Sequence, residues 1–202
     1  MNKSSFIESR FFSLMDVSFS LIKSSLLFWW YVLKNFFIFG FTSSFCTLIE
    51  VVGEVSSGNG KPVKMLFREI FPKYKGYSKV SSAVFIGFVI YFTAFIVLPF
   101  PDAVSPFYSS VIKFACIYAL LLGLVVYTYM CWNIVKKGDR GVKASLFLGF
   151  YLLIKKFFRS LLILLSLVAV CYVSDANFIF LLFFAPGIYA WLAKNILGRM
   201  TV

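Results

Sequence analysis

The side chains that could do chemistry in this chain lie mainly in its first apolar region. Lys34 and Asn35 interrupt an aromatic stretch there, and Glu50 follows further along with Glu54 one helical turn beyond it. Charges inside a membrane are costly and are functional candidates for that reason, so Lys34, Asn35 and Glu50 are our candidates for lining a polar intramembrane cavity. The plainer alternatives are that Lys34 extends its ammonium to the lipid headgroups, and that Glu50 and Glu54 form the solvated end of a helix.

The rest of the sequence offers little catalytic chemistry. The chain contains no His, which removes imidazole metal ligands and the commonest general base. Its four Cys residues have no CxxC spacing and lie in or beside apolar segments, which is typical of small buried side chains. The run 58–61 (GNGK) lacks the remaining positions of a phosphate-binding loop. We therefore expect no catalytic site, no cofactor and no metal.

The composition is that of a membrane protein. Of the 202 residues, 61% are apolar and 27 are Phe, and the mean hydropathy is +0.90. A soluble domain has an apolar share nearer half, so lipid is the expected surrounding for most of this chain. The net charge of +12 lies beside the apolar stretches, where anionic headgroups are the nearest counter-ions, and we expect no nucleic acid partner.

Apolar stretches recur along the chain and predict an all-α fold, a polytopic transmembrane helix bundle of five to six membrane segments. A helix needs roughly 20 apolar residues to cross the core of a bilayer. The clearest spans are 80–98 and 107–133, and shorter ones follow at 160–173 and 178–197. Short connections at 99–106 and 174–177 join the members of each pair.

The first part of the chain leaves the number of spans open. Residues 1–20 mix apolar and charged side chains, as a helix lying on the membrane surface does. Residues 21–55 are expected to form a first span that kinks near Gly40 or returns as a partial hairpin. We favour an N-terminus inside the cell, and five segments with the N-terminus outside is the competing count.

Basic residues mark one face of the membrane. They gather in a loop at 56–79 and in an amphipathic segment at 134–159, whereas the opposite connections carry only Asp102 and Asp175 as charges. Because Lys and Arg are in excess on cytoplasmic loops, both basic segments and the C-terminus are expected in the cytoplasm.

Each basic segment also contains an apolar stripe at helical spacing, and these two amphipathic helices are the strongest candidates for binding. A basic face with embedded aromatic residues can dock on lipid or on a partner protein, and both readings stay open. On a partner, the two stripes would form a joint cytoplasmic platform anchored by aromatic and Arg side chains. The candidate partner-binding residues are Phe67, Arg68, Phe71, Tyr74, Lys75, Phe150, Phe157 and Arg159.

Three features then stand together: an aromatic first span at 26–30 (LLFWW), the segment 62–71 (PVKMLFREIF) leading into a span, and a final pair of spans preceded by a basic helix. This layout resembles the YesL family of bacterial integral membrane proteins. The chain departs from the family at 42–44 (TSS) and at 158–160 (FRS), where members often carry Pro. Members are often encoded beside carbohydrate ABC importers, so the resemblance implies an accessory protein in a bacterial cell membrane.

The expected function is therefore that of a non-enzymatic accessory or assembly protein of a bacterial transport system, with ABC transporter subunits as the membrane partner. Two other classes stay open. A small transporter or channel would need a polar path through the bundle, and few polar side chains fall at mid-membrane. A membrane immunity or receptor protein is the third class.

Overall fold

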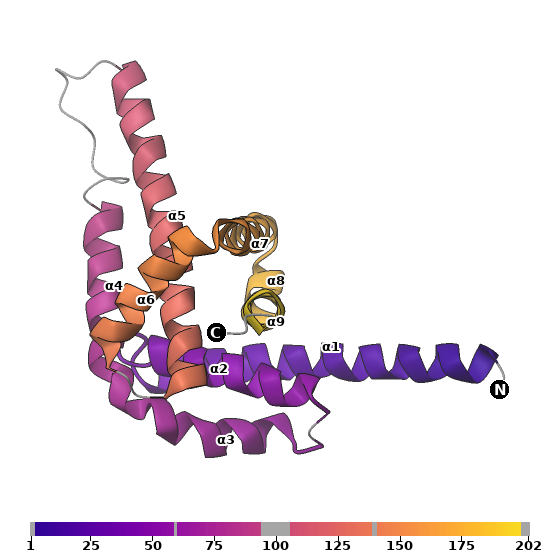
Figure 1. Ribbon diagram of the computed structural model, residues 1–202. Coiled ribbons are helices and arrows are strands. Elements are labelled where there is room, and N and C mark those ends of the chain that lie inside the picture. The colour runs from indigo at the N-terminus through magenta and orange to yellow at the C-terminus, as the bar shows by residue number, and fades with distance from the viewer. Residues whose placement is uncertain (1–2, 59, 94–105, 139–140, 199–202) are drawn as a thin grey trace.

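The computed structural model describes residues 3–58, 60–93, 106–138 and 141–198, and these residues are almost wholly helical, without a β-strand among them. The fold is therefore all-α, as the sequence predicts. Figure 1 shows the helices crossing one another: α1 runs across the view, α5 stands upright, and α7 and α9 are seen nearly end-on. The residues 94–105, which include all but the last residue of the outer connection expected at 99–106, lie outside the described residues.

The chain begins with three helices that lie beside one another, α1 (Lys3–Lys34), α2 (Phe41–Ser56) and α3 (Val63–Tyr74). The turn between α1 and α2 is strained, because Phe36 and Phe37 have φ of 54° and 48°. This left-handed conformation costs a residue other than Gly roughly 1–2 kcal/mol. Pro62, with φ −57°, immediately precedes α3, where its fixed backbone suits the start of a helix.

The 3-10 turn η1 (Lys75–Tyr77) links α3 to α4 (Ser78–Phe92), and α5 (Pro106–Lys137) follows the undescribed connection. The helices α4 and α5 project together from the rest of the molecule in Figure 1. The chain then forms α6 (Val142–Lys155) and α7 (Phe157–Ala176), separated by a break at Lys156 with φ −116° and ψ 48°. It closes with α8 (Phe178–Phe183) and α9 (Ala185–Gly198).

Two of these helices are long and apolar enough to cross a membrane. They are Phe107–Lys137 within α5 and Phe157–Ala176, which is α7, each with a mean hydropathy of 2.1 over its most apolar 18 residues. Only 11% of either window is buried inside the protein. The core helix of a soluble protein would be mostly buried, so these two helices favour a surrounding of lipid.

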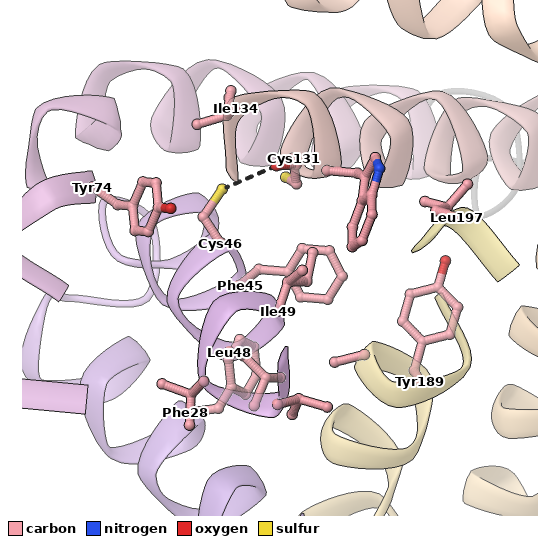
Figure 2. Packing of buried hydrophobic residues seen from close by; sticks show 14 of the residues in the cluster. Phe28, Phe45, Cys46, Leu48, Ile49, Tyr74, Cys131, Ile134, Tyr189 and Leu197 are labelled. Carbon is pink, nitrogen blue, oxygen red and sulfur yellow. Dashed lines mark hydrogen bonds between the residues drawn. The ribbon is translucent and has the colours of Figure 1, made fainter. Parts of the chain in front are cut away.

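The centre of the fold is α2, which is enclosed by other helices. The ring of Phe45 lies between two other rings, with centroids 6.0 Å from Tyr127 of α5 and 6.1 Å from Tyr189 of α9. Figure 2 shows Phe45 and Tyr189 in this core, with Cys46 of α2 pointing toward Cys131 of α5. The core is therefore built by residues from the beginning, middle and end of the chain.

Polar side chains on α2 also join it to its neighbours. Ser43 Oγ donates a hydrogen bond of 2.8 Å to the backbone carbonyl of Tyr74 in α3. The amide of Thr42, in the first turn of α2, donates to Ser81 Oγ of α4 at 3.2 Å. The hydroxyl of Tyr127 in α5 donates to Thr42 Oγ1 at 3.1 Å. A first-turn amide has no partner within its own helix, so Ser81 caps α2 from another element.

Small residues allow two other close contacts. A Cβ added to Gly187 of α9 would lie 2.7 Å from the carbonyl oxygen of Leu21 and from Ser25 Oγ, both in α1. A Cβ added to Gly149 of α6 would lie 3.1 Å from the carbonyl oxygen of Val126 in α5. Close helix packing over small residues is common between membrane helices, where apolar burial alone does not drive association.

Candidate functional site

The apolar stripe of α3, expected to form half of a docking platform, faces the interior of the protein. Phe67 is fully buried, and Phe71 and Tyr74 are 9% and 7% exposed. The ring of Tyr31 in α1 packs against α3, with centroids 5.7 Å from Phe67 and 4.6 Å from Phe71. The expectation of a platform built from these three residues is corrected, because α1 and α2 already cover them. The α3 candidates Arg68 and the neighbouring Lys75 remain exposed.

The candidates that follow α5 are placed differently. Phe150 of α6 is 50% exposed and Phe157 of α7 is 64% exposed. Arg159 is half-buried, and its Nη1 atom is buried without a hydrogen-bond partner among the described residues. At the next residue, Ser160 Oγ lies 3.0 Å from the hydroxyl of Tyr129 in α5. The outward aromatic side chains of α6 and α7 are thus available to a neighbour, whereas those of α3 are not.

Glu50 forms the most specific polar contact of the candidate residues. Its Oε1 atom lies 2.8 Å from the ammonium of Lys73, and its Oε2 atom accepts a hydrogen bond of 2.5 Å from the hydroxyl of Tyr74. The Glu50 side chain is 22% exposed. Burial raises the pKa of Tyr74, and the hydrogen bond to the Glu50 carboxylate and its charge raise that pKa further. The arrangement fixes the end of α3 to α2.

Two cavities meet at Glu50. One, of about 520 Å³, is also lined by Lys73, Tyr74 and residues at the end of α5. The other, of about 410 Å³, is also lined by Glu54, Lys136 and Lys194. This end of the fold therefore presents charges of both signs to open space, as expected of a surface in contact with water. That placement agrees with the plainer reading of Glu50 and Glu54 as a solvated helix end.

Lys34 and Asn35 lie elsewhere. Lys34 is exposed at the end of α1, and Asn35 Nδ2 donates a hydrogen bond of 2.7 Å to the carbonyl of Tyr31. Both line a third cavity, of about 290 Å³, together with Lys75. Lys34 and Asn35 thus share a cavity, whereas Glu50 is not among the residues that line it.

A fourth cavity, of about 240 Å³, lies among α1, α2, α5, α7 and α9. Its lining side chains are aromatic or aliphatic apart from Thr128, and their polar groups are the hydroxyls of Thr128 and Tyr189, which are 2.7 Å apart, the hydroxyl of Tyr127, which bonds Thr42, and the indole N–H of Trp29. An apolar cavity of roughly 150 Å³ already suffices for benzene. The space suits a hydrocarbon group and offers little to a polar solute.

Metal chemistry finds no support in the described residues, where no group of three His, Cys, Asp or Glu side chains comes together. Cys46 of α2 and Cys131 of α5 are both fully buried, with Cys46 Sγ 4.0 Å from the carbonyl oxygen of Cys131. They fill space between the two helices, as the sequence predicts for small buried residues, whereas Cys116 is half-buried and Cys171 is exposed, contrary to that prediction.

The sequence reasoning missed the polar residues that hold the helices together. Thr42 and Ser43 were part of an apolar stretch, and Tyr127 and Tyr189 were parts of expected spans. The signal that could have found them is the density of small hydroxyl residues at 42–47 (TSSFCT), since such residues often join membrane helices.

Comparison with protein-family models, with curated proteins and with solved structures finds no match to this chain. The resemblance to the YesL family therefore remains an expectation from the sequence.

Proposed function

We propose that the protein is a multi-pass protein of a bacterial cell membrane that serves a transport system as a non-enzymatic accessory or assembly subunit. One observation carries this proposal: hydroxyl side chains in the core join the helices to one another, while large apolar side chains face outward. Tyr74 bonds Glu50, Tyr127 bonds Thr42, and Tyr189 pairs with Thr128. Such a molecule has surface to offer to lipid and to a partner, and few free groups for chemistry.

The proposed topology has five membrane segments, with α2 not crossing. Both ends of α2 lie beside the stretch 56–81: its first turn bonds Ser81, and its last turn leads directly into the basic loop. Lys34, at the end of α1, lines the same cavity as Lys75 of that loop. The end of α1 is therefore on the cytoplasmic side with the loop, which puts the N-terminus outside if α1 crosses once.

The five segments are then α1, α4, α5, α7 and the pair α8–α9, with α3 and α6 on the cytoplasmic side. Figure 1 draws α1 across the view, α5 upright and α7 nearly end-on. Spans tilt by up to about 40° from the membrane normal, so in this proposal the crossing segments are strongly tilted relative to one another.

Single cysteines in a variant without the native ones would test this topology. Cysteines at Ser57 and Gly138 should resist a membrane-impermeant maleimide in intact cells and react after the cells are opened. A cysteine at Asp102 or at Ser4 should react in intact cells. Labelling of Ser57 or Gly138 from outside would reject the cytoplasmic loops, and protection of Ser4 with labelling of Asp102 would reject the crossing of α1.

The accessory role is tested by purification in mild detergent from cells that also produce a carbohydrate ABC importer, the partner implied by the resemblance. Co-purification of importer subunits in fixed ratio is the expected result. The variant Phe150→Ala with Phe157→Ala should lose them, because both rings are exposed on the cytoplasmic half of the α6–α7 segment. Phe114→Ala, which removes a ring of α5 that is 73% exposed, is the control and should retain them.

The transporter alternative predicts a different result. Protein that purifies alone and carries solute across the membrane of reconstituted vesicles would replace the accessory role by a transport function. The described cavities disfavour it, since the one among the crossing helices is apolar and the polar ones lie at one end.

A further inference from the structure

The turn between α1 and α2 is the most unusual piece of backbone in the described chain. Phe36 and Phe37 are its residues with positive φ other than Gly. Large side chains rarely adopt this conformation, and it persists where packing or function requires it. Phe37 has a packing reason, since its ring stacks on Trp29 at 6.2 Å and meets Phe85 of α4 edge-on at 5.9 Å.

Packing does not explain the neighbouring side chains. Phe36 is 83% exposed and Phe39 is 51% exposed. Gly would adopt the backbone conformation of Phe36 at no steric cost. Phe at this position is therefore unfavourable in two ways, because its backbone is strained and its apolar ring is exposed. Exposed aromatic rings beside lysines are typical of protein that sits at the level of the lipid headgroups.

Two lysines from distant parts of the sequence meet at this turn. Lys34 from the end of α1 and Lys75 from η1 line the cavity of about 290 Å³ together with Asn35, Ser43 and Ser78. No acidic residue lines this cavity. Lys73, two residues from Lys75, is by contrast paired with Glu50 at 2.8 Å. The Ser43 hydroxyl and the Asn35 amide already donate to backbone carbonyls, so the two ammonium groups and the Ser78 hydroxyl are the donors that suit a phosphate group.

We propose that this cavity binds the phosphate of an anionic phospholipid in the cytoplasmic leaflet, with Phe36 and Phe39 inserted beside the upper part of its acyl chains. This inference rests on the proposed membrane location and adds a ligand to it. A free phosphate ion would use the lysines alone. The two outward rings are what a lipid would cover, because its acyl chains continue past the headgroup.

The experiment uses full-length protein purified in mild detergent, with a fluorescent phosphatidylglycerol as the probe. The test variant is Lys34→Gln with Lys75→Gln. The control is Lys64→Gln with Lys79→Gln, which removes the same charge from exposed positions outside the cavity. Thermal unfolding of each variant shows whether it is folded before its binding is compared.

The expected result is that the test variant binds phosphatidylglycerol roughly 25-fold more weakly, at about fivefold for each lysine, and that the control variant binds within about twofold of the wild type. Equal losses in both variants, or no loss in either, would overturn the site. Inorganic phosphate distinguishes the two sources of the group. Displacement of the probe by phosphate at equal concentration would assign the cavity to a free ion instead.

A second pair of variants tests whether the exposed ring of Phe36 contributes to lipid binding. Phe36→Gly should weaken phosphatidylglycerol binding while raising thermal stability, because it removes the exposed ring and the left-handed strain together. Met65→Gly, at an exposed helical position outside the cavity, is the control and should lower stability without changing binding. Unchanged lipid binding by Phe36→Gly would remove the rings from the proposal. Failure of the membrane topology would show in the labelling of intact cells, which does not depend on this cavity.

Discussion

The two halves of α5 carry similar apolar sequence but lie in different surroundings. Toward its C-terminal end, Val125, Tyr129 and Ile134 are at most 2% exposed. Toward its N-terminal end, Phe107 and Phe114 are 72% and 73% exposed. Hydrophobicity therefore does not tell which half is enclosed by protein. The difference lies in the polar residues, since the enclosed half pairs Tyr127, Thr128 and Tyr129 with other helices.

The forces that hold helices together in a membrane explain this contrast. Lipid tails are as apolar as Phe or Leu side chains, so an apolar face gains little by leaving lipid for protein. Close packing and hydrogen bonds between helices decide which faces are enclosed. We expect changes in the enclosed region to be costly and matched changes in the projecting half of α5 to be nearly silent.

The largest expected contrast is between two phenylalanines. Phe67→Ala should lower the free energy of unfolding in mild detergent by about 3–5 kcal/mol, because the ring is fully buried between α1 and α2. Phe114→Ala, at a ring that is 73% exposed, should change it by less than about 0.5 kcal/mol. Equal effects in thermal or denaturant unfolding would show that the projecting half is as well packed as the core.

Two glycines make the next contrast. Gly187→Ala should destabilise the protein by about 1–3 kcal/mol, because the new Cβ would lie 2.7 Å from backbone and side-chain atoms of α1. Gly123→Ala adds a Cβ with nothing within 4 Å, and should stabilise α5 by up to about 1 kcal/mol. We expect the unfolding midpoint to fall for Gly187→Ala and to rise for Gly123→Ala. A tolerated Gly187→Ala would mean that α1 and α9 do not cross as closely as described.

Tyr74 gives a contrast that depends on pH. Tyr74→Phe should cost about 1.5–3 kcal/mol, because it removes a hydrogen bond to the Glu50 carboxylate. Tyr118→Phe, at an exposed ring of α5, should cost nothing measurable.

The folded-state pKa of Tyr74 is raised by burial, whereas an unfolded tyrosine ionises near pH 10. The stability due to its protonated form is therefore complete below about pH 10 and is lost as the pH rises further. Unfolding midpoints from pH 8 to pH 11 should fall more steeply for the wild type than for Tyr74→Phe. Parallel curves would contradict the raised pKa.

The smallest expected effect lies within the projecting pair of helices. The hydroxyl of Tyr91 in α4 donates a hydrogen bond of 3.0 Å to the carbonyl of Cys116 in α5. Tyr91→Phe should leave the global unfolding midpoint within the error of measurement while speeding amide hydrogen exchange along α4. A large drop in the midpoint would instead join this pair to the core, and the distinction between the two regions would fail.

The positions of helices could be predicted from the sequence, but the elements that pack against each helix could not. The stripe at 66–71 was correctly identified as one face of a helix, because apolar residues recur at helical spacing there. Periodicity does not say what covers such a face. Contact with Tyr31 joins residues far apart in the sequence, and nothing in the local pattern distinguishes it from contact with lipid or with a partner.

The first apolar region shows the same limit for the candidate site. Residues 21–55 were expected to kink or return, and the structure does place a turn at 35–40 between α1 and α2. Lys34 was expected near Asn35 and Glu50; the fold gives Lys34 and Asn35 a shared cavity that Lys75 also lines, whereas Glu50 lines other cavities. That meeting depends on the docking of α3 along α1 and α2, which composition does not encode.

The enclosure of α2 has a consequence for biosynthesis. The helix is complete when the ribosome has passed Ser56, but one of the helices that cover it, α9, ends only at Gly198. At roughly 5–20 residues per second, Phe45 of α2 waits on the order of 10–30 seconds for its neighbour Tyr189 in α9. During that interval α2 is a partly polar helix that lacks one of its packing partners, and a membrane protease or chaperone can bind it. A chain truncated before α8 should therefore be degraded quickly even though every earlier helix has been made.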